Sequence, residues 1–300
     1  LELVFKEFKP DTIIMLAELK SAPYSIKSLG NGNETIRNNL ISNHNILHLM
    51  TKFAPNSHLI HLGTMGVYGY DFSSKLIPDG YYDAVLTNHV GDKLTTKLLH
   101  PASPGSIYHL TKAQEEIMFQ YFNKMYNLKI TDLHQGIVWG VNTRDTEKHE
   151  VLFNRFDYDG DYGTALNRFI VQVAIDFPIT VYGSGNQIRP LINIQNTVDA
   201  ISLVVENPPD TSKVRILNQL SETFKIKDIA INLSNKFNKQ INFQKNPRIE
   251  NENNSLKAKP IGLLELGLKP IYFDIDQISD LIDLAKRFSN RINKDKIIST

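Results

Sequence analysis

The sequence contains no cysteine and a single tryptophan. Without thiols the chain can form no disulfide, bind no metal through thiolates and use no cysteine as a nucleophile. An excess of charge is missing too, because 33 lysines and arginines stand against 32 aspartates and glutamates, which leaves a net charge of +1. We therefore expect no nucleic acid or membrane as partner. We also expect no metal site, so the chemistry must come from oxygen and nitrogen groups or from a cofactor.

Long hydrophobic runs are absent as well. The longest ones, such as Thr12 to Ala17, have the length of a strand and fall far short of the roughly 20 residues that cross a bilayer. The chain begins at Leu1 without a signal-like or transit-like segment. We expect a cytoplasmic protein, or one of the chloroplast stroma if the source is a plant or alga. Its 300 residues, 41% apolar and 22% charged, allow one large globular domain or two ordinary ones.

The first half of the chain alternates strand-like runs with helical stretches. The apolar runs at 12–17, 57–63 and 129–134 predict strands that are buried on both faces. Helices are expected between them, over 35–53 and 108–126. This alternation predicts an α/β fold with a Rossmann-type doubly wound parallel sheet.

The second half changes character from about Arg144, where short strands, loops marked by proline and glycine, and two later helices follow. We therefore place a Rossmann domain at 1–143 and a smaller C-terminal α/β domain for the substrate at 144–300. Segments at about 165–200 are expected to return to the Rossmann core.

Tyr108 and Lys112 lie four residues apart in the second predicted helix. This spacing puts both side chains on one face, so the ammonium can lie beneath the phenol and stabilise its ionised form. The pair would make a general base of the tyrosine. Tyrosine is common in this chain, with 12 copies, and the same spacing also arises by chance.

Glycine-containing loops follow two of the predicted strands. One reads Gly63-Thr64-Met65-Gly66, and the other reads Gln135-Gly136-Ile137-Val138-Trp139-Gly140. In an open parallel sheet the ligand lies beyond the carboxyl ends of the strands, and glycines let backbone approach it closely. The alternative is that these glycines only form turns and that the threonine stands beside them by chance.

In this order, the motifs resemble the extended short-chain dehydrogenase/reductase superfamily, which includes nucleotide-sugar epimerases and dehydratases. Further segments are similar to the UDP-sulfoquinovose synthase family and extend the resemblance from about Phe8 to Ile297. They are Ser21-Ala22-Pro23-Tyr24-Ser25, His61-Leu62-Gly63-Thr64-Met65-Gly66, Gly163-Thr164-Ala165-Leu166-Asn167-Arg168-Phe169, Val181-Tyr182-Gly183 with Gln187 and Arg189, and Asn246-Pro247-Arg248.

The resemblance implies an NAD-dependent enzyme that converts UDP-glucose and sulfite to UDP-sulfoquinovose and water. Tyr108 would take the proton of the sugar 4-hydroxyl while hydride leaves C4, and Thr64 would hydrogen-bond the same oxygen. Lys112 would hold the pKa of Tyr108 near the working pH. His109 would serve the second proton transfer or the departure of water, with a packed or surface histidine as the alternative.

The resemblance also assigns binding residues. NAD contacts are expected from Ala17, Lys20, Asn39, Tyr108, Lys112 and Gln135. Nucleotide-sugar contacts are expected from Thr64, Met65, Gly66, Tyr108, Gln135, Asn167, Arg168, Thr180, Tyr182, Gln187, Arg189 and Arg248. Arginine suits the diphosphate because its guanidinium binds phosphate oxygens in pairs. Asn39 could instead be a surface or helix-bridging amide, and Arg168 a surface charge.

The chain departs from the family pattern in three places. Val67 stands where the family usually has a glutamate, and Leu19-Lys20 stands where it tends to have Gln-Arg. Both changes bear on sulfite addition more than on C4 oxidation. The third departure is the absence of the glycine-rich turn that binds the NAD pyrophosphate between the first strand and first helix. We therefore expect an N-terminally incomplete sequence that binds NAD poorly by itself and exposes a sheet edge.

Two alternatives to the synthase remain. One is another NAD-dependent nucleotide-sugar enzyme, a 4-epimerase or a 4,6-dehydratase, which shares the C4 oxidation. The other is a non-catalytic member that only binds sugar nucleotides, although Thr64, Tyr108 and Lys112 are all present. The resemblance further implies a homodimer and a sulfite-delivering protein as a partner.

Overall fold

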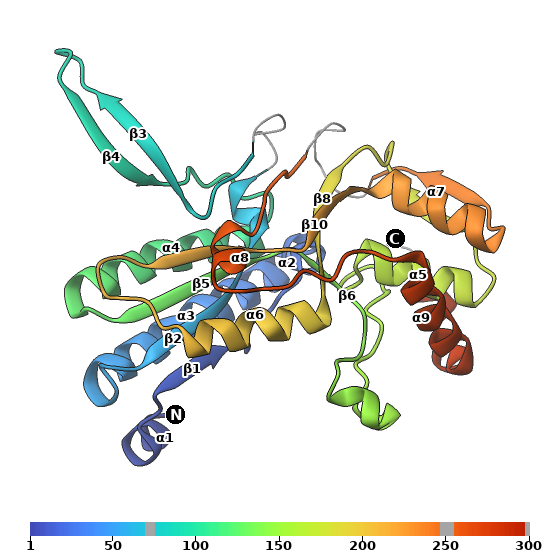
Figure 1. Cartoon of the computed structure of the whole chain (residues 1–300), viewed down its shortest axis with the longest axis horizontal. Coiled ribbons are helices and arrows are strands. Elements are labelled where there is room, and N and C mark those ends of the chain that lie inside the picture. The colour runs from blue at the N-terminus through green and yellow to red at the C-terminus, as the bar shows by residue number, and fades with distance from the viewer. Residues whose placement is uncertain (70–75, 247–254, 298–300) are drawn as a thin grey trace.

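The computed structural model describes residues 1–69, 76–246 and 255–297. Its central feature is a four-stranded sheet in which all neighbouring strands run parallel. The strand order is β1 (Thr12–Met15), β2 (His58–Thr64), β5 (Lys129–Gln135) and β9 (Arg215–Gln219). The prediction of a Rossmann-type parallel sheet is confirmed, and β1 forms one of its edges (Figure 1).

Helices cover both faces of this sheet. One face packs against α3 (Leu29–Phe53) and α4 (Ile107–Tyr126), and the other against α6 (Ile194–Glu206) and α8 (Ile261–Glu265). The alternation of side chains along β2 divides the core accordingly, because Leu59 packs with the first pair of helices and Ile60 with the second. Two short helices, α1 (Glu2–Phe8) and α2 (Ala22–Ile26), precede α3.

A second unit is built mainly from later residues around its own hydrophobic core. Its three-stranded sheet has the order β10 (Glu222–Lys225), β8 (Ile188–Asn193) and β6 (Ile137–Trp139), and β7 (Ile179–Tyr182) pairs with β11 (Ile241–Gln244). The helices are α5 (Ala165–Ala174), α7 (Ile226–Phe237) and α9 (Ile275–Arg287). Trp139, Phe169 and Ile282 are among the buried side chains that join strands and helices.

The segment that returns to the Rossmann core lies later in the chain than the expected 165–200. The residues of α5 and β7 belong to the core of the second unit, whereas α6 and β9, over 194–219, pack with the parallel sheet. The reason is the apolar face of α6, where Ala200 and Val204 lie fully buried against the strands. The chain therefore crosses between the two units at β8.

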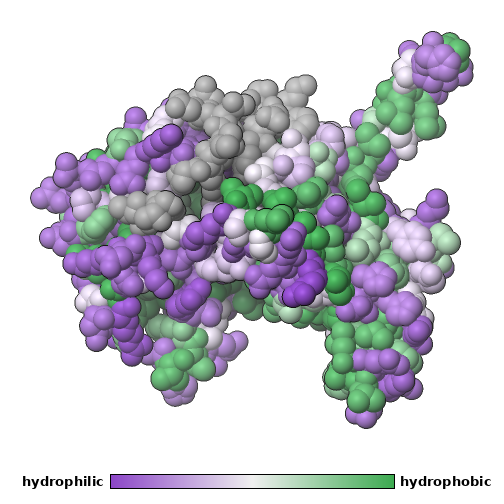
Figure 2. All heavy atoms as spheres, turned by 180° about the vertical axis from the view of Figure 1, so that it is seen from behind, coloured by the Kyte–Doolittle hydropathy of each residue, from purple (hydrophilic) through white to green (hydrophobic). Residues whose placement is uncertain are grey.

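An antiparallel hairpin, β3 (Tyr81–Thr87) and β4 (Lys93–Leu99), was not expected from the sequence. It projects away from the body of the molecule (Figure 1), and Figure 2 shows apolar residues along it beneath a polar tip. Val85 and Leu94 are 61% and 60% exposed and Leu86 and Leu98 are 43% exposed, so the period of two that marks a half-buried strand is weak. Short 3-10 helices lie at Met65–Tyr68 (η1), Thr146–Lys148, Glu150–Leu152, Ser289–Arg291 and Lys294–Lys296.

Among the described residues, no helix combines the length and the apolar character that crossing a membrane requires.

Candidate active site

Thr64 and Gln135 lie side by side at the carboxyl edge of the parallel sheet. They are paired residues at the ends of β2 and β5. Thr64 also begins η1, because its hydroxyl accepts a hydrogen bond from the backbone N–H of Gly66 at 3.1 Å. This is the edge at which ligands bind in open parallel sheets.

The start of α4 is held against this edge by two contacts. The N–H of Tyr108 donates to the hydroxyl of Ser25 at 3.0 Å, which ties α4 to α2. The ring of His109 lies against Gly66, where an added Cβ would come within 2.3 Å of Nε2. The fit against His109 therefore requires a glycine at position 66.

Tyr108 and Thr64 are brought together by this arrangement, and their hydroxyl groups interact. Burial raises the pKa of the Tyr108 phenol well above its ordinary value, and the charge of Glu115 raises it further. His61 and the Thr64 hydroxyl lower this pKa, but by less. The role of Tyr108 as an activated base stays a prediction.

Lys112 does not place an unpaired ammonium beneath the phenol of Tyr108, because other groups surround its Nζ atom. Its Nζ lies 2.9 Å from both His61 Nε2 and the carbonyl of Leu62. It forms an ion pair with Glu18 and lies 3.4 Å from Glu115 Oε2. Two carboxylates therefore offset the charge that was expected to stabilise a phenolate. Burial lowers the pKa of Lys112, and the carboxylates oppose this shift.

This group continues inward as a buried network. Asp132 bridges two histidines, with Oδ1 2.8 Å from His61 Nδ1 and Oδ2 3.2 Å from His134 Nε2. Burial alone would lower the histidine pKa values, but the surrounding carboxylates raise both to about 10. Burial likewise opposes ionisation of Asp132, yet the two histidines hold the pKa of this carboxyl well below its usual range.

The sequence carries a signal for this network. His61, Asp132 and His134 lie inside runs that were predicted to be strands buried on both faces. Ionisable groups are rarely buried unless they are paired, so their presence there indicates partners. Asp132 also explains Gly63, because a Cβ at that residue would lie 2.3 Å from Oδ1.

The residues assigned to NAD have different surroundings. Ala17 and Lys20 are exposed beyond β1, and the ammonium of Lys20 lies 2.6 Å from Asp157. Asn39 is fully buried, and its amide bonds the backbone of Leu19 and the hydroxyl of Thr111. Of the two alternatives for Asn39, the structure has the helix-bridging amide.

Several residues assigned to the nucleotide sugar gather in the second unit. The guanidinium of Arg168 lies 4.5 Å from the ring centre of Tyr182 and donates to the carbonyl of Thr180 at 3.4 Å. Gln187 donates to the carbonyl of Tyr182 at 3.3 Å. Arg168 is 6% exposed, so it is not the surface charge that was considered as its alternative.

Four further residues were assigned to the nucleotide sugar. Met65 is buried in an apolar cluster that also contains Val67, which gives it a packing role. Asn167 is buried on α5, and Arg189 is buried on β8. Arg248 lies outside the described residues.

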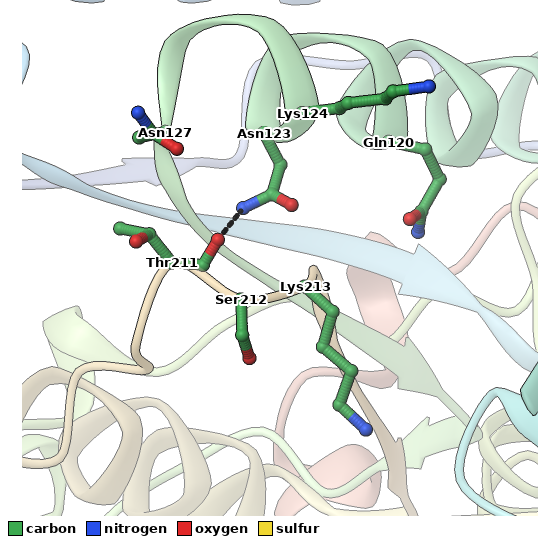
Figure 3. A pocket seen from close by; sticks show the side chains of 7 residues that line it. All are labelled: Gln120, Asn123, Lys124, Asn127, Thr211, Ser212 and Lys213. Atoms are coloured by element: carbon green, nitrogen blue, oxygen red, sulfur yellow. Dashed lines mark hydrogen bonds between the residues drawn. The ribbon is translucent and has the colours of Figure 1, made fainter.

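A shallow polar pocket is found at the far end of α4 (Figure 3). Its lining includes Gln120, Asn123 and Asn127 from that end of the helix, together with Thr211 to Lys213. Gln120 is 12 residues from Tyr108, which corresponds to roughly 18 Å along a helix. This pocket is therefore separate from the Thr64 and Tyr108 pair.

Comparison with known proteins agrees with this arrangement. The chain belongs to the NAD dependent epimerase/dehydratase family, whose model matches residues 1–218. The structure is similar to that of UDP-glucuronic acid 4-epimerase from Bacillus cereus in complex with UDP-glucuronic acid and NAD. The TM-score is 0.69 at 20% identity, over 97% of this chain and 77% of that one.

Two curated relatives are similar to the chain over most of its length. The chain is 36% identical to chloroplastic UDP-sulfoquinovose synthase of Spinacia oleracea, over 98% of this chain and 61% of the relative. It is 33% identical to UDP-sulfoquinovose synthase of Sulfolobus acidocaldarius, over 89% of this chain and 67% of the relative. The resemblance drawn from the sequence is confirmed, and the chain spans about three fifths of the length of the spinach relative.

Proposed function

We propose that the protein is an NAD-dependent enzyme that makes UDP-sulfoquinovose and water from UDP-glucose and sulfite. The observation that carries the proposal is that Thr64 and Tyr108 lie together at the carboxyl edge of the parallel sheet. The likeness to two relatives of this name supports the same reaction. Since the chain spans 61% of the spinach relative, the proposal concerns the full-length gene product.

The chain has residues that could hold the nicotinamide end of NAD. Ala17 is exposed beyond the carboxyl end of β1, next to the edge where Thr64 and Tyr108 lie, and these residues would hold the nicotinamide end. We propose that the pyrophosphate is held by residues outside this chain, because no strand among the described residues leads through a glycine-rich turn into a helix. When bound, NAD supplies a reversible acceptor of hydride with a positively charged ring.

The residues of the chain would divide the proton transfers among them. Thr64 orients the 4-hydroxyl of glucose, and Tyr108 takes its proton as hydride leaves C4, which leaves a ketone on the sugar. The ketone makes the C5 proton acidic. His109, beside Tyr108, would take that proton or give one to the departing 6-hydroxyl, which leaves as water and creates a C5=C6 double bond conjugated to the ketone. Sulfite then adds at C6 while C5 regains a proton, and hydride would return to C4 while Tyr108 gives its proton back to the C4 oxygen.

The nucleotide end would bind to the second unit. Arg168 and Arg189 supply positive charge for the diphosphate, and Arg248 would add to it. Asn167, Thr180, Tyr182 and Gln187 line the same region, and the remaining assigned contacts come from Met65, Gly66 and Gln135. In the ligand-free chain Thr180 is already engaged, because its hydroxyl accepts a bond from Gln172 at 2.6 Å.

The finer assignments belong to the same proposal. The protein would act as a homodimer in the cytoplasm or chloroplast stroma, receive sulfite from a delivering protein and supply sulfolipid or sulfonated-glycan synthesis. Lys20 would offer positive charge to sulfite. We assign no acid or base role to position 67, because Val67 is fully buried in an apolar cluster.

The test is to incubate the full-length gene product with NAD, UDP-glucose and sulfite and to determine the mass of the product. A UDP-linked sulfonate is expected, and the Tyr108→Phe variant should lose at least about a hundredfold in rate because it loses the group that transfers the proton. Lys20→Ala should reduce the use of sulfite more than the oxidation at C4.

A second candidate function is favoured by Val67 and Lys20, which depart from the family pattern. The protein would then be another nucleotide-sugar enzyme, a 4-epimerase or a 4,6-dehydratase. An epimer or a 4-keto-6-deoxy sugar in the presence of sulfite, without any sulfonate, would replace the first proposal by the second. If the full-length gene product gave no turnover of UDP-glucose and Tyr108→Phe left its biological role unchanged, both would be wrong and a non-catalytic binding role would follow.

A further inference from the structure

Two groups of ionisable side chains lie on either side of Asp132. The first consists of Glu18, His61 and Glu115, and the second consists of His100, Glu116 and His134. In each group the nitrogen and oxygen atoms that could bind a metal ion lie within 4.8 Å of one another. The two groups share Asp132, whose oxygens each contact a histidine of one group.

The two groups differ in what supplies their positive charge. In the first, the ammonium of Lys112 lies among the side chains and contacts all three of them. In the second, no lysine or arginine of the described part of the chain pairs with Glu116, whose ion-pair partners are His100 and His134. Together the groups hold four carboxylates against one ammonium and three imidazoles.

We propose that a divalent transition-metal ion, with Zn²⁺ as the best fit, binds among His100, Glu116 and His134. Two imidazoles with one carboxylate form a donor set that zinc prefers. The three side chains would supply three ligands, and Asp132 lies beside them with Oδ2 3.2 Å from His134 Nε2. No metal site was expected from the sequence, because the three residues lie far apart in the chain.

The distances suit a shared metal ion. Nε2 of His100 lies 2.7 Å from Glu116 Oε2, and Nε2 of His134 lies 3.0 Å from Glu116 Oε1. Ligand atoms about 2.1 Å from a tetrahedral zinc ion are separated by roughly 3.4 Å. A movement of a few tenths of an ångström outward would therefore open each pair to this geometry.

An independent observation comes from Glu116 itself. Its side chain is 2% exposed, and Oε1, which makes no hydrogen bond of good geometry, lies 3.0 Å from His134 Nε2. With His134 neutral, as a metal ligand must be, a bound cation would take the place of the proton between these two atoms. His100 and His134 are also buried, so a metal ion here would be enclosed by protein.

Tyr68 orients one of the ligands. Its hydroxyl donates to Asn218 Oδ1 at 2.7 Å, so the same oxygen is left to accept from His134 Nδ1 at 2.8 Å. With its hydrogen on Nδ1, the ring can direct the lone pair of Nε2 at a metal ion. Histidines that bind metals commonly donate their second ring nitrogen to such a partner.

The metal ion would cross-link three segments of the chain. His100 follows β4 at the base of the hairpin, Glu116 lies on α4 one turn after Lys112, and His134 lies on β5 just before Gln135. Binding would stabilise the folded protein, because ligands that are far apart in sequence come together only in the native state. The role is structural and does not depend on the proposed reaction.

The experiment uses the full-length gene product, freed of metals with a chelator and then dialysed against Zn²⁺ or Co²⁺. We expect one tightly held zinc ion per chain by elemental analysis and intense visible absorption from tetrahedral Co²⁺. Glu116→Gln and His100→Ala should each weaken metal binding by about 10- to 100-fold or more. His58→Gln, which changes a buried histidine on β2 outside the cluster, should keep the metal.

Measurements on the wild-type protein test the proposed metal site even if the variants fold poorly. A melting temperature that rises with Zn²⁺ but not with Mg²⁺, together with the Co²⁺ spectrum, supports the site. If the wild-type protein holds no zinc and gives no Co²⁺ absorption at micromolar metal, the group is a network of ion pairs with protonated histidines and the proposal is wrong. Metal that persists in both cluster variants would also overturn it.

Discussion

At the scale of single residues, the main feature is that buried charges are matched one against another. The ammonium of Lys112 is almost completely buried, and Glu18, Glu115 and His61 surround it. Burying a charge is expensive unless partners offset the cost, and removing one partner leaves the others uncompensated. Lys112 is therefore a structural necessity as well as a residue proposed to act in the reaction.

We predict that Lys112→Met lowers the free energy of unfolding by about 3–5 kcal/mol, because two buried carboxylates lose their cation. The matched control is Lys6→Met, which removes a lysine paired with Glu2 at 2.7 Å on the surface. That change should cost less than about 1 kcal/mol. Urea unfolding of both variants measures the difference, and equal effects would show that the buried network contributes no more than a surface pair.

A second prediction concerns His58. Burial lowers its pKa to about 4, with further lowering by Arg215 and Lys129. The unfolded chain binds a proton at about pH 6.5 while the folded chain does not, so His58 removes stability as the pH falls from 6.5 toward 4. The slope is at most about 1.4 kcal/mol per pH unit. Urea unfolding at several pH values should show a shallower loss for His58→Gln, whereas His89→Gln, at an exposed position, should follow the wild type.

At the scale of elements, the contact between η1 and α4 positions the site. His109 at the start of α4 lies against the backbone of Gly66 in η1, and this contact brings Tyr108 to Thr64 at the end of β2. Each element begins with a side-chain cap, because Ser106 accepts from the N–H of His109 and Thr64 accepts from that of Gly66. The geometry of the pair thus depends on a glycine and a histidine that fit each other.

Gly66→Ala should therefore separate the two elements. The new Cβ would lie 2.3 Å from His109 Nε2, so the ring or the start of α4 must move, and we expect a loss of about 1–3 kcal/mol in stability together with reduced turnover. Gly30→Ala is the matched control. Gly30 lies in α3, and a Cβ added there would meet no atom closer than 3.6 Å. That control should be neutral or stabilising. If the double variant Gly66→Ala, His109→Ala recovered nothing, the clash would not be the cause.

At the scale of the whole molecule, the parallel sheet has an unpaired edge at β1. In the described structure β1 pairs with β2 alone, and Ile14 on this strand is 42% exposed. An exposed apolar strand edge is a template for pairing with another chain. The projecting hairpin is a second exposed element, but its two strands pair with each other.

We predict that the 300-residue chain by itself associates through the β1 edge. Ile14→Lys should reduce that association, because a charge on an edge strand opposes pairing between sheets. Light scattering as a function of concentration would measure it. Val85→Lys on the hairpin is the control and should leave association unchanged; if it reduced association equally, the hairpin and not the edge would be responsible.

Much of the fold could be predicted because local patterns set it. The apolar runs predicted where β1, β2 and β5 lie, although β1 is not buried on both faces, since Ile14 is 42% exposed. The helix α4 begins one residue before its expected start, and α3 begins six residues before its own. The hairpin was missed because its side chains are largely exposed, which leaves no pattern of burial along the chain. The boundaries of the returning segment were missed because only packing decides which sheet α6 covers.

The sequence by itself determined which groups exist at the site: Thr64 after a strand, Tyr108 and Lys112 on one face of a helix, and no thiol anywhere. Only the tertiary structure decided what charge those groups carry. Lys112 was expected to activate Tyr108, but Glu18 comes from another part of the chain and Glu115 lies beside Lys112 on the same helix. The energy of a buried charge depends on its distance to every neighbouring charge, and those distances are fixed only when the strands and helices pack together.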